Sequence, residues 1–210
     1  TLEPYDVASK AYKIDADVND GNFSINPNSD YSSGDVSDQT KKDLKERAQG
    51  EFLLLQNIRN EGWYKYLTGY GMLVWRIDYA DKSTVSLGDF PNNDKGISRV
   101  MVVPADGLVI NQANCGDGMK YTWDEYTQNA QNDPFPAYNA GEDGKDINSL
   151  TEVKFNWSTL TTRPLYNIKK DEASGMVTFD YLKDFAADAA VKGITMDEDN
   201  QPTKYFDLEG

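Results

Sequence analysis

The chain has 210 residues, enough for one large domain or two small ones. It carries 35 acidic and 21 basic residues, a net charge of −14, which argues against binding to nucleic acid or to anionic membranes. It has no histidine and a single cysteine, Cys115. Histidine-based zinc sites, serine triads, cysteine–histidine pairs and an internal disulfide are therefore excluded. We expect Cys115 to be a small packed residue.

The first fifty residues offer little material for a core. Ala11–Ile14 favours a short strand, and residues 15–36 read as a polar loop. A helix is predicted over residues 37–49, with Gly50 at its stop. Because that helix is almost wholly polar, we expect it to lie on the surface.

Three apolar runs follow, and they are the best candidates for central strands. They are Phe52–Leu55, Gly71–Tyr79 and Arg99–Val103, with Pro104 closing the third. A short helix is predicted around residues 122–131, and a rigid extended loop at Asp133–Pro136. Later strands are predicted at Glu152–Trp157, Leu165–Ile168 and Gly175–Tyr181, the last two forming a hairpin whose turn is Asp171–Gly175.

These elements predict a mainly β chain with sandwich-like antiparallel sheets and a few short helices. We expect residues 1–183 to form one β-rich accessory domain, in which residues 15–49 are a polar loop and surface helix. Residues 184–192 favour a short alanine-rich helix. Residues 184–210 are expected to be a linker and the beginning of a truncated module.

The polar loop contains a candidate calcium site. Asp15, Asp17 and Asn19 place oxygen ligands at alternating positions ahead of Gly21, which is the pattern a calcium loop needs. The glycine comes one position late, however, and the bidentate glutamate is missing. The alternative is a turn-rich loop whose aspartates cap local amides.

A cluster of aromatic residues precedes the second apolar run. Trp63, Tyr64, Tyr66 and Tyr70 lie within eight residues of one another. Such a cluster is a candidate platform for stacking on sugar rings or gripping a peptide. The simpler expectation is that it covers a core, because aromatic side chains dominate core burial.

Carboxylates are the remaining candidates for catalysis. Glu51 and Asp78 are the best placed, at the ends of two expected strands. A hydrolase would need such a pair in one cleft. Alternatively, they accept hydrogen bonds from loops or pair with Arg59, Arg76 or Arg99.

Two ordered blocks carry a family resemblance. Glu51–Asn57 followed by Gly62–Tyr79 resembles E-Y-F-L-L-E-N-R-Q and G-W-D-x-Y-L-P-G-H-G-L-L-I-W-H-V-D, blocks of secreted bacterial metallopeptidases of the immune inhibitor A type. In that family the blocks lie downstream of the zinc-binding helix. Further similar segments are Val103–Gly107 (E-A-D-G), Asp133–Pro136 (D-P-W-P), and the closing hairpin at Pro164–Ile168 and Gly175–Phe179. The tail Lys204–Gly210 is similar to the opening of C-terminal secretion-associated modules.

The resemblance singles out four polar residues of the two blocks: Glu51, Asn57, Arg76 and Asp78. Tyr70 and Arg76 stand where the family has histidine, so the polar site of the relatives is altered here. The resemblance implies a secreted or cell-surface protein whose segment packs beside an upstream protease-like domain of the same chain. Zinc would belong only to that upstream catalytic domain, and no cofactor except calcium is expected in this segment.

Three functions remain open at this point. The first is a non-catalytic structural or substrate-presenting domain, which is not an enzyme by itself. The second is a glycan- or peptide-binding module of a bacterial cell-surface protein, and the third is a carboxylate-dependent hydrolase. No nucleic-acid partner is expected. No run of apolar residues is long enough to predict a membrane span.

Overall fold

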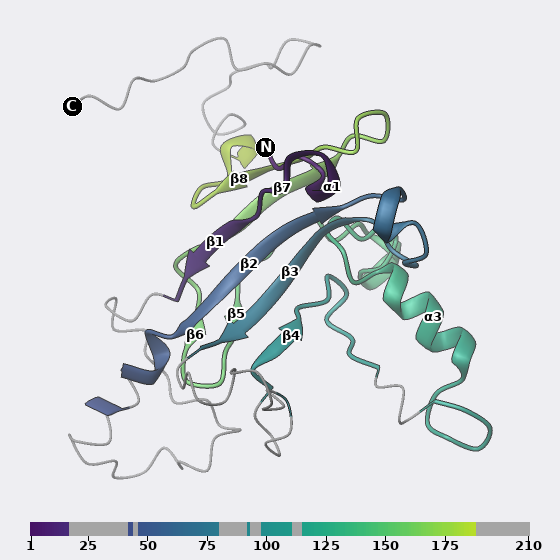
Figure 1. The fold of residues 1–210 in the computed structure, drawn as a ribbon, viewed down its shortest axis with the longest axis horizontal. Helices are drawn as coiled ribbons and strands as arrows, with labels where there is room; N and C mark the ends of the chain where they lie inside the picture. Colours follow the sequence, from purple (N-terminus) through teal and green to yellow (C-terminus); the bar gives the residue numbers. More distant parts are fainter. Residues whose placement is uncertain (17–41, 44–45, 80–91, 93–97, 111–114, 188–210) are drawn as a thin grey trace.

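The computed structural model describes residues 1–16, 42–43, 46–79, 92, 98–110 and 115–187, and it confirms a mainly β chain with antiparallel strands and few short helices. The largest sheet has four antiparallel strands in the order β1-β2-β3-β4 (Figure 1). Its strands are β1 (Tyr12–Asp15), β2 (Glu51–Ile58), β3 (Gly71–Asp78) and β4 (Val100–Val102). These strands agree with the predicted ones, although β2 is twice as long as its apolar run.

Alternation along β2 decides which face of the sheet is the core face. Leu53 and Leu55 are buried, whereas their neighbours Phe52, Leu54 and Gln56 are only partly buried. Leu55 lies directly opposite Val74 of β3 in the antiparallel register, and Val74 is also buried. Because side chains alternate between the faces of a strand, this register puts one row of apolar side chains from both strands into the core.

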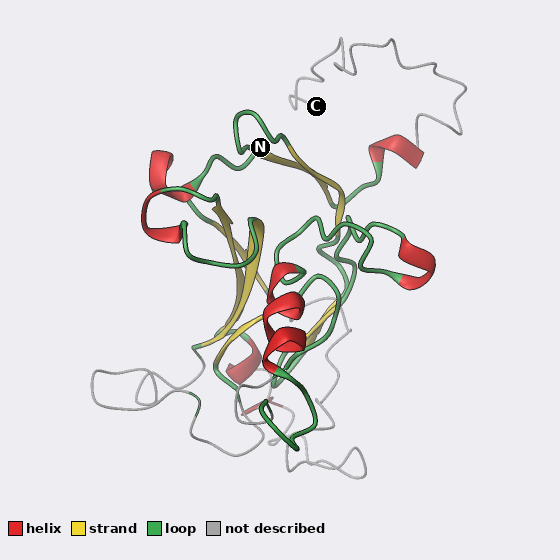
Figure 2. Ribbon diagram, turned by 90° about the vertical axis from the view of Figure 1, so that its right-hand side faces the viewer, coloured by secondary structure: helices red, strands yellow, loops and turns green. Residues whose placement is uncertain are grey.

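Two hairpins complete the core. One joins β5 (Val153–Lys154) to β6 (Thr159–Leu160), and the other joins β7 (Leu165–Lys170) to β8 (Val177–Tyr181). Phe155, Leu165, Ile168 and Val177 of these hairpins share the core cluster with Leu53. Figure 2 shows the large sheet nearly edge-on, with most of the loops on one side of it. The hairpins do not form a second continuous sheet among the described residues, so a sandwich is not established.

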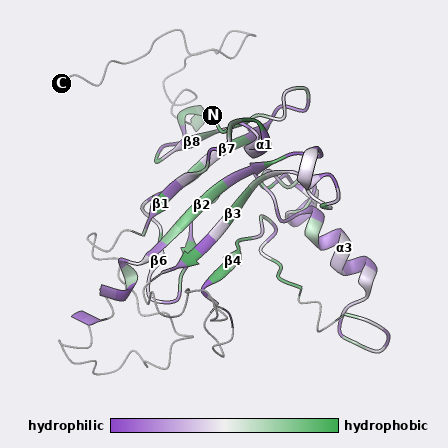
Figure 3. Ribbon diagram, viewed as in Figure 1, coloured by the Kyte–Doolittle hydropathy of each residue, from purple (hydrophilic) through white to green (hydrophobic). Residues whose placement is uncertain are grey.

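The helices are short. They include α1 (Tyr5–Ala8), η1 (Gly62–Tyr64), α3 (Trp123–Gln131) and η4 (Glu142–Gly144). The predicted helix near 122–131 is confirmed as α3, which begins with a capping box between Thr122 and Glu125. Figure 3 shows α3 mostly in hydrophilic colours, in agreement with its lack of buried residues.

One predicted strand is wrong. The segment 152–157 was expected to be continuous, but β5 contains only Val153 and Lys154, and the chain then bends before β6 begins at Thr159. The reason is that Asn156 and Trp157 turn toward polar groups of the large sheet. The predicted C-terminal hairpin is confirmed, with Asp171 capping its turn. Cys115 is buried, as expected.

Other predictions fall largely outside the described residues. Most of the polar loop 15–36 and all of the tail 188–210 are among them. Of the predicted surface helix 37–49, residues 42–43 and 46–48 are described and helical, and all of them except Ala48 are exposed. The alanine-rich helix is described only at residues 185–187, which are helical. Within the part of the chain that the structure describes, no helix has the length and apolar character required to cross a membrane.

Gly71 is a position at which the fold requires glycine. Its φ is +141°, and a Cβ there would lie 2.6 Å from the carbonyl oxygen of Phe135. Phe135 and Met72 exchange backbone hydrogen bonds at this point, so the clash cannot be relieved without breaking them. We predict that Gly71→Ala lowers the free energy of unfolding by about 2 kcal/mol or more. Denaturant unfolding measures this change in free energy. Gly107→Ala is the control, because Gly107 also has a positive φ but a Cβ there would meet no atom within 4 Å. The control therefore reports the cost of the backbone conformation without the cost of the clash.

Candidate functional site

Two of the four polar residues that the resemblance singled out face each other across β2 and β3. Glu51 and Asp78 are directly paired in the register, and their exposed fractions are 0% and 1%. Two buried carboxylates side by side require either a shared proton or several donors. The structure supplies donors from the turn between β5 and β6.

Asp78 is held by three donors that converge on one oxygen. Its Oδ2 accepts hydrogen bonds from Asn156 Nδ2 and Trp157 Nε1, both at 2.9 Å. A guanidinium nitrogen of Arg99 lies 3.3 Å from the same oxygen, and this ion pair is buried on both sides. Asp78 therefore joins β3, the residue before β4, and the β5–β6 turn.

Glu51 binds the same turn through its own two oxygens. Oε1 accepts from the backbone N–H of Trp157 at 2.8 Å, and Oε2 accepts from Ser158 Oγ at 2.6 Å. Burial raises the pKa of Glu51 to about 8, and the charge of Asp78 adds to this, whereas the bonds from Ser158 and Trp157 act in the opposite direction. The glutamate is therefore mainly protonated at neutral pH.

Arg76 and Asn57 anchor other segments. Arg76 donates to the backbone oxygens of Lys154 and Ser98, and burial lowers its pKa, although Glu51 and Asp78 act against that shift. Asn57, near the far end of β2, donates from Nδ2 to the oxygens of Leu2 and Gly175. The structure thus brings Glu51, Arg76 and Asp78 together at one end of the sheet and places Asn57 at the other.

This arrangement favours a structural role for the carboxylates. Glu51 and Asp78 have no exposed surface on which a substrate could sit, and the donors that reach them come from the fold itself. The alternative that they accept hydrogen bonds from loops and pair with an arginine is confirmed, with Arg99 as the partner of Asp78. Asn156, Trp157 and Ser158 were not singled out from the sequence, because they lie about a hundred residues from Glu51.

The aromatic cluster behaves differently from the core lid that was the simpler expectation. Trp63 is 93% exposed and Tyr66 is 83% exposed, so that expectation is wrong for both. Tyr64 and Tyr70 are only partly exposed. The aromatic loop, residues 62–70, therefore directs two large rings into solvent and keeps two others against the protein.

The aromatic loop is nevertheless anchored to the sheet. Gln56 donates to the Tyr64 hydroxyl at 2.9 Å and accepts from Trp75 Nε1 at 3.1 Å, so β2, β3 and the loop are linked on one face. At its other end, Gly69 packs so closely against the carbonyls of Ala130 and Gln131 that a Cβ would lie less than 3 Å from both. Two exposed rings on an anchored backbone bind at a lower entropy cost than rings on a free loop.

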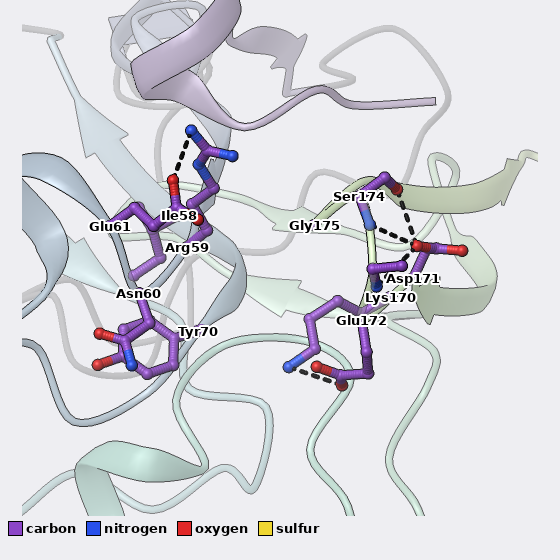
Figure 4. A pocket seen from close by; sticks show the side chains of 11 residues that line it. Ile58, Arg59, Asn60, Glu61, Tyr70, Lys170, Asp171, Glu172, Ser174 and Gly175 are labelled. Carbon is purple, nitrogen blue, oxygen red and sulfur yellow. Dashed lines mark hydrogen bonds and ion pairs between the residues drawn. The ribbon is translucent and has the colours of Figure 1, made fainter.

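A polar hollow borders this loop. Its volume is about 180 Å³, and it lies between the end of β2 and the turn of the β7–β8 hairpin (Figure 4). Tyr70 belongs to its wall, together with Arg59 and Lys170. Arg59 forms ion pairs with Asp6 and Glu61, and Lys170 pairs with Glu172. The hollow therefore adds a polar surface beside the exposed rings, with its cations already paired.

The candidate calcium ligands are only partly described. Asp15 is exposed at the end of β1 and forms an ion pair with Lys13, while Asp17 and Asn19 lie outside the described residues. Among the residues that are described, no three acidic or cysteine side chains gather into a group that could hold a metal ion.

We predict that millimolar calcium changes the melting temperature by less than about 1 °C, because the loop lacks the bidentate glutamate and an ion bound weakly at that concentration stabilises the fold very little. Differential scanning calorimetry with calcium and with EDTA checks this. A rise of several degrees that Asp15→Ala abolishes would show that the loop is a real site.

The comparisons with known proteins add no relative. Protein-family models, curated proteins and solved structures were compared with the chain, and none of them matches it. The aromatic loop, the buried network and the surfaces around them are therefore the features from which a function can be inferred.

Proposed function

We propose that this chain is a non-catalytic accessory domain that binds an extended polypeptide through the aromatic loop and presents it to a protease-like domain of the same secreted protein. The observation that carries the proposal is the exposure of Trp63 and Tyr66 on an anchored backbone. Exposed tryptophan and tyrosine are the side chains most often found at binding hot spots, because they bury a large area at little entropy cost.

The buried network supports the same proposal from another direction. Glu51 and Asp78 tie the β5–β6 turn to the end of the large sheet, so the best-placed carboxylates serve the fold. Their burial favours an accessory domain over a carboxylate-dependent hydrolase. The resemblance of the β2–β3 segment to the metallopeptidase blocks supplies the expected partner, an upstream protease-like domain.

A glycan-binding module is the second candidate. Stacked sugars use the same exposed aromatic faces, so Trp63 and Tyr66 alone do not separate the two ligand classes. Polypeptide is favoured because cationic and anionic side chains both line the hollow beside the loop. Such side chains suit the backbone amides and charged side chains of a peptide better than a neutral sugar.

Parallel screens separate the candidates. The purified domain is applied to an array of unstructured dodecapeptides and to an array of neutral oligosaccharides. We predict selective binding to a subset of peptides, lost in Trp63→Ala and Tyr66→Ala. Tyr79→Ala is a matched control, because Tyr79 is also exposed but lies directly after β3, at the end of the strand opposite the aromatic loop. Binding to oligosaccharides alone would replace the polypeptide with a glycan, and binding that survives both loop variants would contradict the proposal.

A further inference from the structure

A second pocket lies between β4, the segment that follows β4, and α3, and the sequence does not predict it. Its volume is about 160 Å³. Most of its wall is apolar, contributed by Val102, Leu108, Val109, Ile110, Tyr126 and Ala130. Leu108 and Val109 are about half exposed, so the pocket opens through an apolar rim.

One carboxylate, that of Asp133, belongs to this wall, together with the amide of Asn129. Asp133 is partly buried, and its side chain makes no hydrogen bond or ion pair with any residue that the structure describes. Only its backbone oxygen is used, by the N–H of Ala105 at 3.0 Å. A half-buried carboxylate that has only solvent as its partner is less well stabilised as an anion than an exposed one, and a cationic ligand can supply a better partner.

The neighbouring charge has the same sign. Asp106 accepts from Leu108 N and from Asn129 Nδ2, both at 2.9 Å, which fixes it beside the pocket. Burial raises the pKa of Asp133 to about 6, and the charge of Asp106 contributes to the rise. Asp133 is therefore mostly ionised at neutral pH, in an environment that disfavours its charge and that an added cation would relieve.

We propose that this pocket binds a basic side chain, an alkyl stem ending in a cation, with the stem against the apolar wall and the cation on Asp133. Lysine and arginine have this amphipathic construction, with an apolar stem and a charged end. A divalent metal fits less well, because both oxygens of Asp106 already accept hydrogen bonds and no third acidic ligand is grouped with it among the described residues.

The pocket and the aromatic loop share a neighbour. Ala130 lines the pocket, and its carbonyl is the group against which Gly69 packs. We extend the proposal to one extended peptide that places an aromatic or apolar residue on Trp63 and a basic residue on Asp133. In this form the inference rests on the proposed function and adds a preference for basic polypeptides, in keeping with a net charge of −14.

The pocket can be tested without any peptide. Pentylamine and 1-pentanol share a five-carbon stem and differ in charge, and each is titrated at pH 7.5 while amide resonances around Leu108 and Ala130 are followed by NMR. We expect pentylamine to bind at least five-fold more tightly than pentanol. In Asp133→Asn that preference should vanish while the affinity for pentanol is unchanged. The variant should fold normally, because the carboxylate has no described partner to lose, and a melting curve verifies this.

Equal binding of the two probes by the wild-type domain, or amine-induced shifts that persist in Asp133→Asn, would overturn the inference. Shifts produced by millimolar calcium and not by pentylamine would overturn it as well. Peptide binding that persists in Trp63→Ala would contradict only the proposed function and would say nothing about the Asp133 pocket. The two proposals can therefore fail separately. A peptide pair that differs by lysine against norleucine then connects them, with a preference for lysine expected in the wild type and none in Asp133→Asn.

Discussion

Replacing Asp78 with alanine is expected to lower the free energy of unfolding by about 3–5 kcal/mol, the cost of leaving a buried charge without its partner. Arg99 would lose the carboxylate 3.3 Å away, and Asn156 and Trp157 would lose the acceptor of their side-chain bonds. Small domains are stable by about 5–15 kcal/mol, so this is a large fraction of the total. Urea unfolding followed by far-ultraviolet circular dichroism measures the change.

Two substitutions at Asp78 that remove different parts of its interactions test why the domain loses stability. Asp78→Asn keeps one acceptor oxygen and removes the charge. Its free energy of unfolding should therefore lie between those of the wild type and of Asp78→Ala. Glu61→Ala serves as a surface control, because Glu61 is exposed and its pair with Arg59 is open to solvent. If Asp78→Ala costs no more than Glu61→Ala, the three donors do not hold the turn as described.

Replacing Glu51 with glutamine is expected to make the domain more stable at alkaline pH and to leave its stability nearly unchanged in acid. Burial raises the pKa of Glu51 from 4.5 to about 8, so between these values the folded state holds a proton that the unfolded state has released. Stability contributed by this group is therefore complete below about pH 4.5 and is lost as the pH rises toward 8. The steepest loss is about 1.4 kcal/mol for each pH unit.

Glutamine copies the neutral form of Glu51. Its oxygen can accept from the N–H of Trp157 and its amide can face Ser158, but it has no proton to lose. The difference in unfolding free energy between Glu51→Gln and the wild type should grow from about pH 5 to pH 8 and then level off. The comparison cancels the titration of all other groups. A difference that stays constant over that range would show that Glu51 is ionised in the folded protein.

The strands could be predicted from the sequence because their signal is local. Gly71–Tyr79 alternates at its end and is bounded by glycine, and β3 ends one residue earlier than predicted. The strand predicted over residues 152–157 is wrong for a physical reason. Val153 and Phe155 have the spacing of a strand, but Asn156 and Trp157 donate hydrogen bonds to carboxylates of the large sheet, and these bonds turn the chain away. No local pattern reveals partners that lie 106 residues away.

The candidate sites were predictable in part. The aromatic loop was visible as a cluster, but its periodicity does not tell which rings face solvent, and the structure divides them into exposed Trp63 and Tyr66 and partly covered Tyr64 and Tyr70. The Asp133 pocket was not predictable, because its wall combines β4, the following loop and α3. The sequence also cannot show that the carboxylate of Asp133 lacks a hydrogen-bond or ion-pair partner among the described residues.

In the proposed function, Trp63 and Tyr66 serve a ligand and not the fold. The most direct measurement takes a peptide selected from the array and determines, for the wild type and for the double variant Trp63→Ser, Tyr66→Ser, both the affinity by calorimetry and the free energy of unfolding. We expect at least a ten-fold loss of affinity, with stability within about 0.5 kcal/mol of the wild type, as for exposed positions. Unchanged affinity, or a loss of stability of several kcal/mol, would contradict it.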